Sequence, residues 1–231
     1  NAYGTKLLSS TYIALQYNKQ NIYKGFGVNA GFTVVHYSNA NLRAPNNSTN
    51  TFAFNVGANY NLDHEEFPEY IPEGERTKYT EPVHYNLVLR GGVNESDIIG
   101  QGRFPFFVVS AFADKRINHK STLVAGTDVF FAYFFKELIK LQAASFPELE
   151  VDGDEDWKRV GLFVGHELRF NKIAFVSHLG YYIYYPYEFE NRLYNRLGLK
   201  RYFSEDVSAS VTVKAHGAKA EGVEFSVGYR F

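Results

Sequence analysis

The sequence of 231 residues contains no cysteine, which excludes a disulfide framework, a thiolate nucleophile and a cysteine metal site. It also lacks an excess of charge of either sign. With 24 Lys and Arg against 25 Asp and Glu, the formal net charge is −1, so no basic field points to a nucleic acid partner. No uninterrupted apolar run approaches about 18 residues, which excludes a helical membrane span. Methionine is absent, as expected of a processed chain.

Aromatic residues are abundant instead, at 17% of the chain, and they fall in runs that alternate with a period of two. Between residues 22 and 38, one parity carries large apolar side chains such as Phe32 and Val34. The other parity carries small or polar ones such as Gly31 and Thr33. The same alternation recurs to the end of the chain. A helix does not produce this pattern, so we predict an all-β protein.

The length of these runs favours a membrane over water. Many are about 10 to 15 residues long, which exceeds a usual globular strand but suffices to cross a bilayer at a tilt. Tyrosines cluster at run ends, as in residues 181–187, where an aromatic girdle meets lipid headgroups. We therefore predict an antiparallel transmembrane β-barrel rather than a soluble sandwich. The last segment, Val227-Gly228-Tyr229-Arg230-Phe231, resembles the C-terminal signal of bacterial outer-membrane barrels.

Eleven runs are countable, and bacterial barrels normally have an even number of strands. We therefore predict twelve strands, the first preceding residue 1, with ten as the next choice, in a single barrel domain over residues 1–231. If the last strand ends in the periplasm, the longer loops are extracellular. The acidic connection 63–82 is the exception, and it is either a partner-binding loop or a sign of a shifted register. The runs are 5–18, 22–38, 51–62, 82–94, 103–114, 120–136, 157–170, 172–185, 189–203, 206–216 and 220–231.

Charged and histidine side chains share the small-residue parity of the later runs. Paired charges that fill the lumen explain them, and a polar translocation path is the alternative. Residues 135–149 predict a short amphipathic helix, lying on the membrane or over the barrel mouth. The acidic loop 152–156 lacks the spacing of a calcium loop and is read as solvated, so no metal site is predicted. The lumen set is His84, Arg90, Asp128, Glu167, Arg169, His178, Arg192, Lys214, Glu224 and Arg230.

His36 and Ser38 stand on the apolar, lipid-facing parity at the end of the second run. Polar residues at the membrane interface are tolerated, so an interfacial pair hydrated among headgroups is one interpretation. Residues i and i+2 of a strand share a face about 7 Å apart, close enough for an imidazole to accept a serine proton. A catalytic pair is the other interpretation.

The longer string His36-Tyr37-Ser38-Asn39-Ala40-Asn41-Leu42-Arg43-Ala44-Pro45-Asn46 closely resembles the active-site segment of the lipid A 3-O-deacylases of the outer membrane. The resemblance implies that Ser38 is the nucleophile and His36 the general base. It implies that Asn46 contributes to the oxyanion hole and that Asn39 lies near the substrate. The resemblance covers about two dozen residues. The chemistry that it implies requires no cofactor.

Two positions depart from the pattern of that family. Asn41 replaces a glycine that supplies a backbone amide to the oxyanion, and Asn tolerates positive φ better than most residues. Asn50 replaces the glutamate that orients the histidine. An asparagine carbonyl can hold the imidazole tautomer but supplies no full charge, so slower or differently tuned chemistry is expected.

The resemblance implies an integral protein of the bacterial outer membrane with its site at the outer leaflet, and lipid A or lipopolysaccharide as its partner among membrane lipids. Two alternatives stay open. One is a catalytically inactive barrel that serves as a subunit of an outer-membrane assembly, with another outer-membrane protein as partner. The other is a small pore or transporter.

Overall fold

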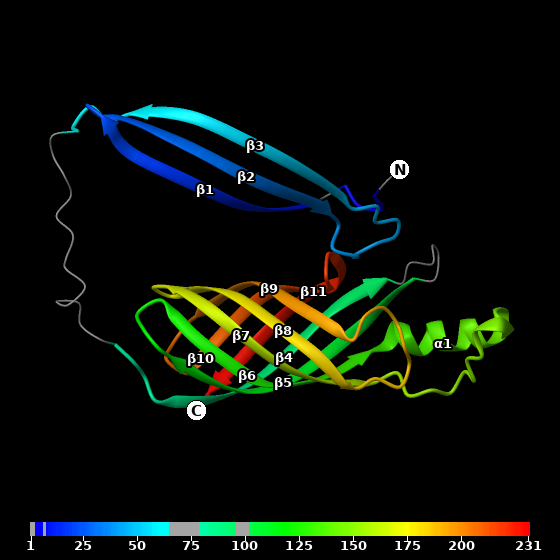
Figure 1. The fold of residues 1–231 in the computed structure, drawn as a ribbon. Helices are drawn as coiled ribbons and strands as arrows, with labels where there is room; N and C mark the ends of the chain where they lie inside the picture. Colours follow the sequence, from blue (N-terminus) through cyan, green and yellow to red (C-terminus); the bar gives the residue numbers. More distant parts are fainter. Residues whose placement is uncertain (1–2, 7, 65–78, 96–101) are drawn as a thin grey trace. The chain divides into compact units, whose positions relative to one another are not determined.

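The computed structural model describes residues 3–6, 8–64, 79–95 and 102–231. Most of the acidic connection at 63–82 therefore lies outside the described residues. The chain divides into two compact units. One is a three-stranded sheet and the other is a closed eight-stranded barrel (Figure 1).

The first unit is an antiparallel sheet with the order β1-β2-β3. Its strands are long, and large apolar residues alternate with small or polar ones along β2 and β3. The register pairs Leu15 of β1 with Phe32 of β2, and Phe32 with Phe54 of β3, so one face collects the large side chains. The bounds are β1 Ser9–Tyr23, β2 Phe26–Ser38 and β3 Thr49–Tyr60.

The first hairpin turns later than the sequence predicted. Its turn is Lys24-Gly25, with φ of 42° and 89°, the positive values that tight two-residue hairpins require. Residues 19–21, which separate the first two predicted runs, instead form an irregularity within β1. Asn21 takes a φ of 50° there, and its side-chain oxygen accepts the Gly25 N–H at 2.9 Å.

Eight further strands form the barrel, and each pairs antiparallel with its neighbours. The last strand closes on the first, with Phe225 opposite Gly91 and Arg230 opposite Asn86. The order around the barrel therefore follows the chain. The strands are β4 Val83–Glu95, β5 Arg103–Arg116, β6 Ser121–Ala132, β7 Arg159–Phe170, β8 Ile173–Tyr184, β9 Leu193–Tyr202, β10 Val207–His216 and β11 Lys219–Arg230.

The antiparallel all-β fold is confirmed, whereas the prediction of twelve strands, or ten, in one barrel is wrong. Each of the eleven runs overlaps a strand, but the barrel closes on eight of them. Apolar and small residues alternate with the same period in both sheets. This alternation does not encode which strands pair. Closure is fixed by the β11–β4 ladder, which joins residues more than 100 positions apart.

The barrel lumen is filled by a neutralised polar network. Arg196 lies at its centre, with Nη1 2.9 Å from Asp128 Oδ2 and Nε 2.5 Å from Glu224 Oε2. The Tyr194 hydroxyl donates to Asp128 at 2.8 Å. These charged side chains are fully buried, and burial of this kind is tolerated only when the charges are paired and hydrogen-bonded.

The predicted lumen set is right for six residues: Arg90, Asp128, Glu167, His178, Lys214 and Glu224 are buried. It is wrong for Arg192, whose side chain is 47% exposed and pairs with Glu188 at 3.4 Å, because β9 begins only at Leu193. It also omits Arg196, the centre of the network.

The helix α1, Tyr133–Ser145, follows β6 directly and is followed by the short 3-10 helix η2, Pro147–Leu149. Its apolar residues Phe135 and Leu138 are buried in the core cluster of the barrel unit. The guanidinium of Arg159 stacks 3.8 Å from the Phe135 ring centroid. Since the apolar face is used inside the protein, the helix covers barrel residues rather than lying on the membrane.

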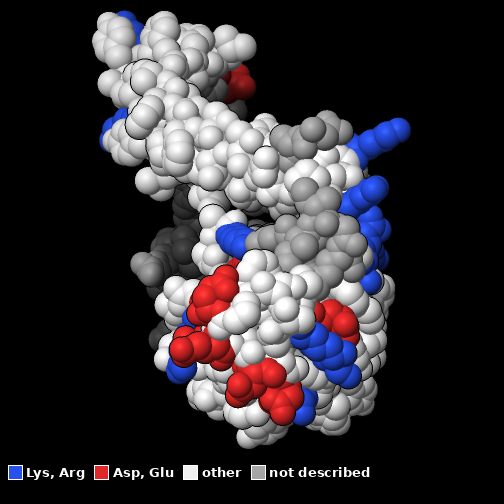
Figure 2. All heavy atoms as spheres, turned by 90° about the vertical axis from the view of Figure 1, so that its right-hand side faces the viewer, with Lys and Arg blue, Asp and Glu red and all other residues white. Residues whose placement is uncertain are grey.

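The described helices include none that is long and apolar enough to cross a membrane. Figure 2 looks onto the end of the barrel that carries α1 and shows charged side chains of both signs gathered there. A mixed, charged surface of this kind suits the part of a barrel that meets water.

Candidate active site

The large-residue face of the three-stranded sheet carries a polar row near one end. His36 of β2 lies opposite Thr11 of β1 and opposite Asn50 of β3. The next row toward the end pairs Ser38 with Ser9. Cross-strand partners share a face, so His36, Ser38 and Asn50 all project on the side of Phe32 and Phe54.

His36 and Asn50 are joined by a hydrogen bond of 2.7 Å between Nδ1 and Oδ1. The Asn50 oxygen is an acceptor, so His36 carries its proton on Nδ1 and donates it. The lone pair then resides on Nε2, which is the tautomer that a general base needs. The contact is fixed by the strand register, because the two residues are direct partners.

Ser38 is the last residue of β2 and is 4% exposed, and the following Asn39 is 2% exposed. The two-residue spacing puts the Cα atoms of His36 and Ser38 about 7 Å apart on one face. This spacing is compatible with the pairing of a nucleophile and its base.

The next segment, Ala40–Asn46, groups with the barrel unit. Ala40 and Asn41 have φ of 51° and 60°, the left-handed conformation that Asn accepts more readily than most residues. The Asn41 side chain donates to the Glu95 carbonyl at 3.0 Å, and the Glu95 carboxylate accepts the Ala44 N–H at 3.0 Å. Asn46 is half-buried in this segment.

Sequence reasoning missed Glu95. It lies one residue beyond the predicted fourth run and 51 positions from Ala44. Its signal is weak, since an acidic residue at a strand end is ordinarily a solvated one. In the structure, Glu95 connects the Asn41–Ala44 segment to the end of β4 through these hydrogen bonds.

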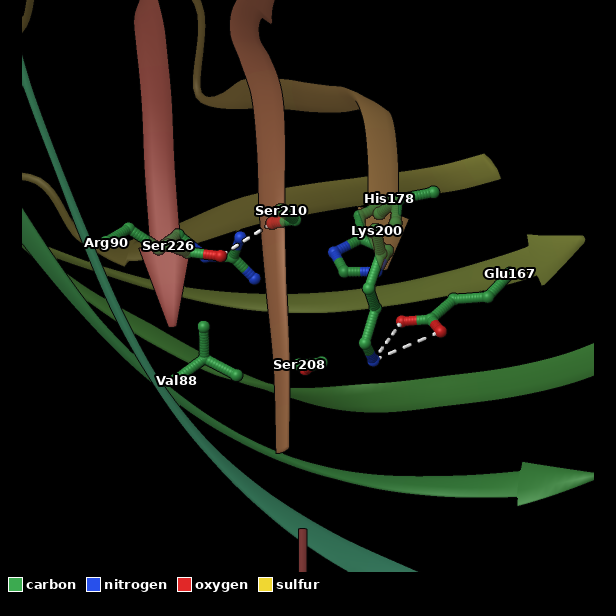
Figure 3. Close-up of a pocket in the computed structure, with 9 residues that line it drawn as sticks. Val88, Arg90, Glu167, His178, Lys200, Ser208, Ser210 and Ser226 are labelled. Carbon is green, nitrogen blue, oxygen red and sulfur yellow. Dashed lines mark hydrogen bonds and ion pairs between the residues drawn. The ribbon is translucent and has the colours of Figure 1, made fainter. Parts of the chain in front are cut away.

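The barrel interior holds a second group of polar side chains (Figure 3). Lys200 reaches Glu167 at 3.0 Å, and the hydroxyls of Ser210 and Ser226 lie 2.6 Å apart. The cavity beside them has a volume of about 10 Å³. That is space for one water molecule and not for a lipid chain or a solute.

The acidic loop uses its carboxylates internally. Glu155 accepts the N–H groups of Asp152 at 2.9 Å and Gly153 at 3.1 Å. Partial burial opposes the ionisation of Asp156, but hydrogen bonds from the Lys158 N–H and the Tyr184 hydroxyl hold the pKa of Asp156 below its ordinary value. Within the described ranges, no group of three or more His, Asp or Glu is placed to hold a metal ion.

Comparisons with known proteins follow the same division of the chain. Residues 83–231, which contain all eight barrel strands, match the family model described as acyloxyacyl hydrolase, C-terminal domain. Residues 1–59, which contain most of the three-stranded sheet, match the model described as lipid A 3-O-deacylase (PagL). No curated protein matches the chain.

Among solved structures, a KdgM porin covers 97% of this chain and 95% of its own at 9% identity. The TM-score of the two structures is 0.28.

The fold is an antiparallel all-β one with a closed eight-stranded barrel, and His36 and Asn50 form a hydrogen-bonded polar pair on the three-stranded sheet. The chain belongs to the acyloxyacyl hydrolase family, whose model covers well over half of it. It is thus a lipid A deacylase-like protein of the outer membrane.

Proposed function

We propose that the protein is a carboxylic ester hydrolase that removes an ester-linked 3-hydroxyacyl chain from lipid A. The observation that carries the proposal is the 2.7 Å hydrogen bond from His36 Nδ1 to Asn50 Oδ1, two residues from Ser38 on the same face. A histidine held in this tautomer is suited to proton transfer, which supports the proposed role of His36 as general base.

In the proposed mechanism, lipid A reaches the protein by lateral diffusion in the outer leaflet. His36 Nε2 takes the proton of Ser38 as Oγ attacks the ester carbonyl carbon. The oxyanion is held by the backbone N–H of Asn41 and the side chain of Asn46, roles that rest on the family pattern. One such donor is worth roughly 3 to 4 kcal/mol to acyl transfer.

The intermediate collapses when His36 returns the proton to the departing sugar hydroxyl, which leaves the acyl chain on Ser38. Water then gives its proton to His36 and attacks the acyl-enzyme. The products are a free 3-hydroxy fatty acid, lipid A with one hydroxyl restored, and the regenerated serine. Asn39 lies beside the reacting ester in this scheme. Apart from water, each step uses only groups of this chain.

The test is mass spectrometry of purified lipid A incubated in detergent with the protein and with its Ser38→Ala variant. We expect the mass of one 3-hydroxyacyl group to be lost with the unchanged protein only. The matched control is Ser210→Ala, which removes a buried lumen hydroxyl and should leave hydrolysis within about twofold. Unchanged lipid A across several acylation patterns would refute the proposal.

A second candidate is a non-catalytic, deacylase-like subunit of an outer-membrane assembly. The neutral Asn50 favours it, because the usual acidic residue would stabilise an imidazolium more strongly. Stable co-purification of another outer-membrane protein, with no hydrolysis, distinguishes it. The filled lumen speaks against a pore, since the cavity beside Lys200 and Glu167 has a volume of only about 10 Å³.

A further inference from the structure

The outer wall of the eight-stranded barrel carries an apolar groove along β5 and β6. Small outward side chains form its floor and larger ones border it on β4 and β7, so that the wall is hollowed to a volume of about 650 Å³. Because outward side chains of a membrane barrel face hydrocarbon, a groove of this kind accepts a hydrocarbon chain. The floor consists of Ala111, Ala113, Ala125 and Thr127, and the borders include Tyr85 and Val164.

A row of outward side chains lies beside one end of this groove. It runs from Lys115 of β5 through Leu123 of β6 to His166 of β7, which are cross-strand partners. Leu123 precedes Ala125 by two residues and His166 follows Val164 by two, so the row and the groove share one face of the wall. The Cα atoms of Lys115 and His166 are two strand spacings, about 10 Å, apart. Both side chains can therefore reach one ligand that lies over Leu123.

The row crosses the tilted strands at changing depth. Lys115 is one residue from the end of β5, whereas His166 is four residues from the end of β7 at Phe170. This difference of three residues places His166 roughly 8 Å deeper along the barrel axis, for strands tilted by about 40°. The long lysine side chain can extend to the membrane surface, but the imidazole is too short to do so. His166 therefore stays among lipid while Lys115 reaches the headgroups.

Neither polar side chain is satisfied by the protein. Among the described residues, Lys115 and His166 have no hydrogen bond or ion pair. The outward positions of β5, β6, β7 and β8 carry no Asp or Glu, and the β8 partner of His166 is Ser177. An ionisable side chain at membrane depth is costly and marks a functional site unless it is paired. The partner of this row is therefore supplied by the membrane.

The chemistry of the ligand follows from the order of these features along the barrel axis. A cation lies at the headgroup level, an N–H donor lies below it, and an apolar groove lies deeper still. A glycerophospholipid has a phosphate, ester carbonyls and acyl chains in the same order. A negatively charged headgroup fits best, because an ethanolamine ammonium would find no carboxylate on this face.

The position of the row selects one leaflet. It lies toward the end of the barrel that has the short connections 117–120 and 171–172. Outer-membrane barrels place their short turns in the periplasm. The ligand therefore belongs to the periplasmic leaflet, whereas lipid A belongs to the outer one.

We propose that the row and the groove bind one anionic glycerophospholipid from the periplasmic leaflet. Lys115 pairs with its phosphate, and the N–H of the His166 imidazole donates to an ester carbonyl. One acyl chain lies in the groove over Ala125 and Thr127. This lipid site lies on the barrel wall and is separate from the esterase site proposed at Ser38.

The test uses the full chain with Ser38→Ala, folded in a nonionic detergent and titrated with phosphatidylglycerol. Native mass spectrometry counts the bound lipids and gives Kd. Three variants remove one part of the site each: Lys115→Gln removes the cation, His166→Leu removes the donor, and Ala125→Leu fills the groove.

Two variants on the far wall serve as matched controls. Arg201→Gln removes an outward cation that lies one residue from the end of β9, as Lys115 does on β5. Ala209→Leu enlarges a small residue of β10, whose cross-strand partner is Arg201. Neither residue lines the groove.

We expect one phosphatidylglycerol per chain. Each of the three site variants should raise Kd at least fivefold, and each control should change it less than twofold. Phosphatidylethanolamine should bind more weakly, and diacylglycerol, which has no phosphate, at least tenfold more weakly. His166→Leu should leave the unfolding midpoint in lipid-free detergent unchanged or raised, which separates a lost lipid site from a lost fold. Phosphatidylglycerol with a diazirine in its acyl chain should label β5 and β6.

Three results would overturn the proposal. The first is a Kd that no site variant changes more than the controls do. The second is diazirine labelling spread evenly over the eight barrel strands, which would mean ordinary contact with bulk lipid. The third is displacement of phosphatidylglycerol by an equal concentration of lipid A or of inorganic phosphate. Because every sample lacks the Ser38 hydroxyl, none of these results depends on ester hydrolysis, and failure here is separate from failure of the proposed esterase.

Discussion

The three-stranded sheet and the eight-stranded barrel share one alternation and differ in what lies on their polar faces. The barrel lines its interior with fully buried charges joined in pairs, such as Arg196 with Glu224. The sheet lines the corresponding face with Gly and Asn and places its notable polar residues, His36 and Asn50, on the apolar face instead. The comparison teaches that the same period-two alternation can place polar side chains on either face: in the barrel they form buried ion pairs, and in the sheet they form a hydrogen-bonded pair among apolar side chains.

The largest expected effect separates the two regions by activity. His36→Ala should lower kcat/KM for lipid A by about 10⁴-fold, because the general base is lost. His178→Ala, in the barrel, should leave the rate of the folded protein within about twofold. His178 is buried against Phe163, with ring centroids 4.8 Å apart, so its loss should lower stability instead. Initial rates and denaturant titrations of both variants make the measurement, and equal rates for both would break the comparison.

The next largest effect is expected on the free energy of unfolding, when the buried ion pairs of the barrel are broken. Arg196→Met should lower the free energy of unfolding by about 3 to 5 kcal/mol, because Asp128 and Glu224 are left as uncompensated buried charges. Arg192→Met, which removes an exposed pair, should cost less than about 1 kcal/mol. Urea titration of protein refolded into lipid vesicles measures both. Similar losses of unfolding free energy for the two variants would show that the buried ion pairs of the lumen stabilise the fold no more than an exposed pair does.

A smaller change is expected from restoring the acidic residue to the sheet. Asn50→Asp should raise kcat about tenfold, since a carboxylate stabilises the imidazolium that forms when His36 takes the proton. Asn50→Leu, which accepts no hydrogen bond, should lower it instead. The pH profile of kcat distinguishes the two effects, and an Asn50→Asp rate below that of the unchanged protein would contradict the orienting role.

The smallest effect concerns a cluster of Tyr79, Glu81, Arg116 and Arg230, at the end of the barrel where β4 begins. Partial burial opposes ionisation of Glu81, but hydrogen bonds from Tyr79, Arg230 and Arg116 outweigh it and hold the pKa of Glu81 at about 2. A lowered pKa stabilises the fold above the ordinary pKa near 4.5 and ceases to do so as the pH falls toward 2.

Glu81→Gln should therefore cost less than about 1 kcal/mol at pH 7, after allowance for solvent screening. The difference from the unchanged protein should shrink between pH 4.5 and 2. Unfolding titrations at pH 7, 4 and 2.5 test this, and a difference that grows on acidification would reverse the assignment.

Much of the fold could be predicted from the sequence because alternation encodes strands locally. The parity of Phe32 and Phe54 correctly gave the apolar face of the first sheet, and the same counting put His36, Ser38 and Asn50 on that face. The division into two sheets could not be predicted this way. It depends on the β11–β4 ladder, a contact between distant residues that period-two patterns do not record.

One signal for the division was present in the sequence. The small-residue parity carries charges such as Arg90 and Asp128 only after residue 83, and the earlier strands carry none. The tie between Glu95 and the Ala40–Asn46 segment had no comparable signal, since it joins a strand end to a loop 51 residues away. The roles of Ser38 and Asn46 remain predictions from the family pattern.

The single-water cavity of the barrel has a consequence for the cell that carries the protein. A wide barrel leaves an aqueous channel across the membrane, whereas a narrow one can be filled by its own side chains. A barrel whose centre is an interlocked Arg196–Asp128–Glu224 cluster adds no route for diffusion. A membrane that holds many copies of such a filled barrel is therefore no more permeable because of them.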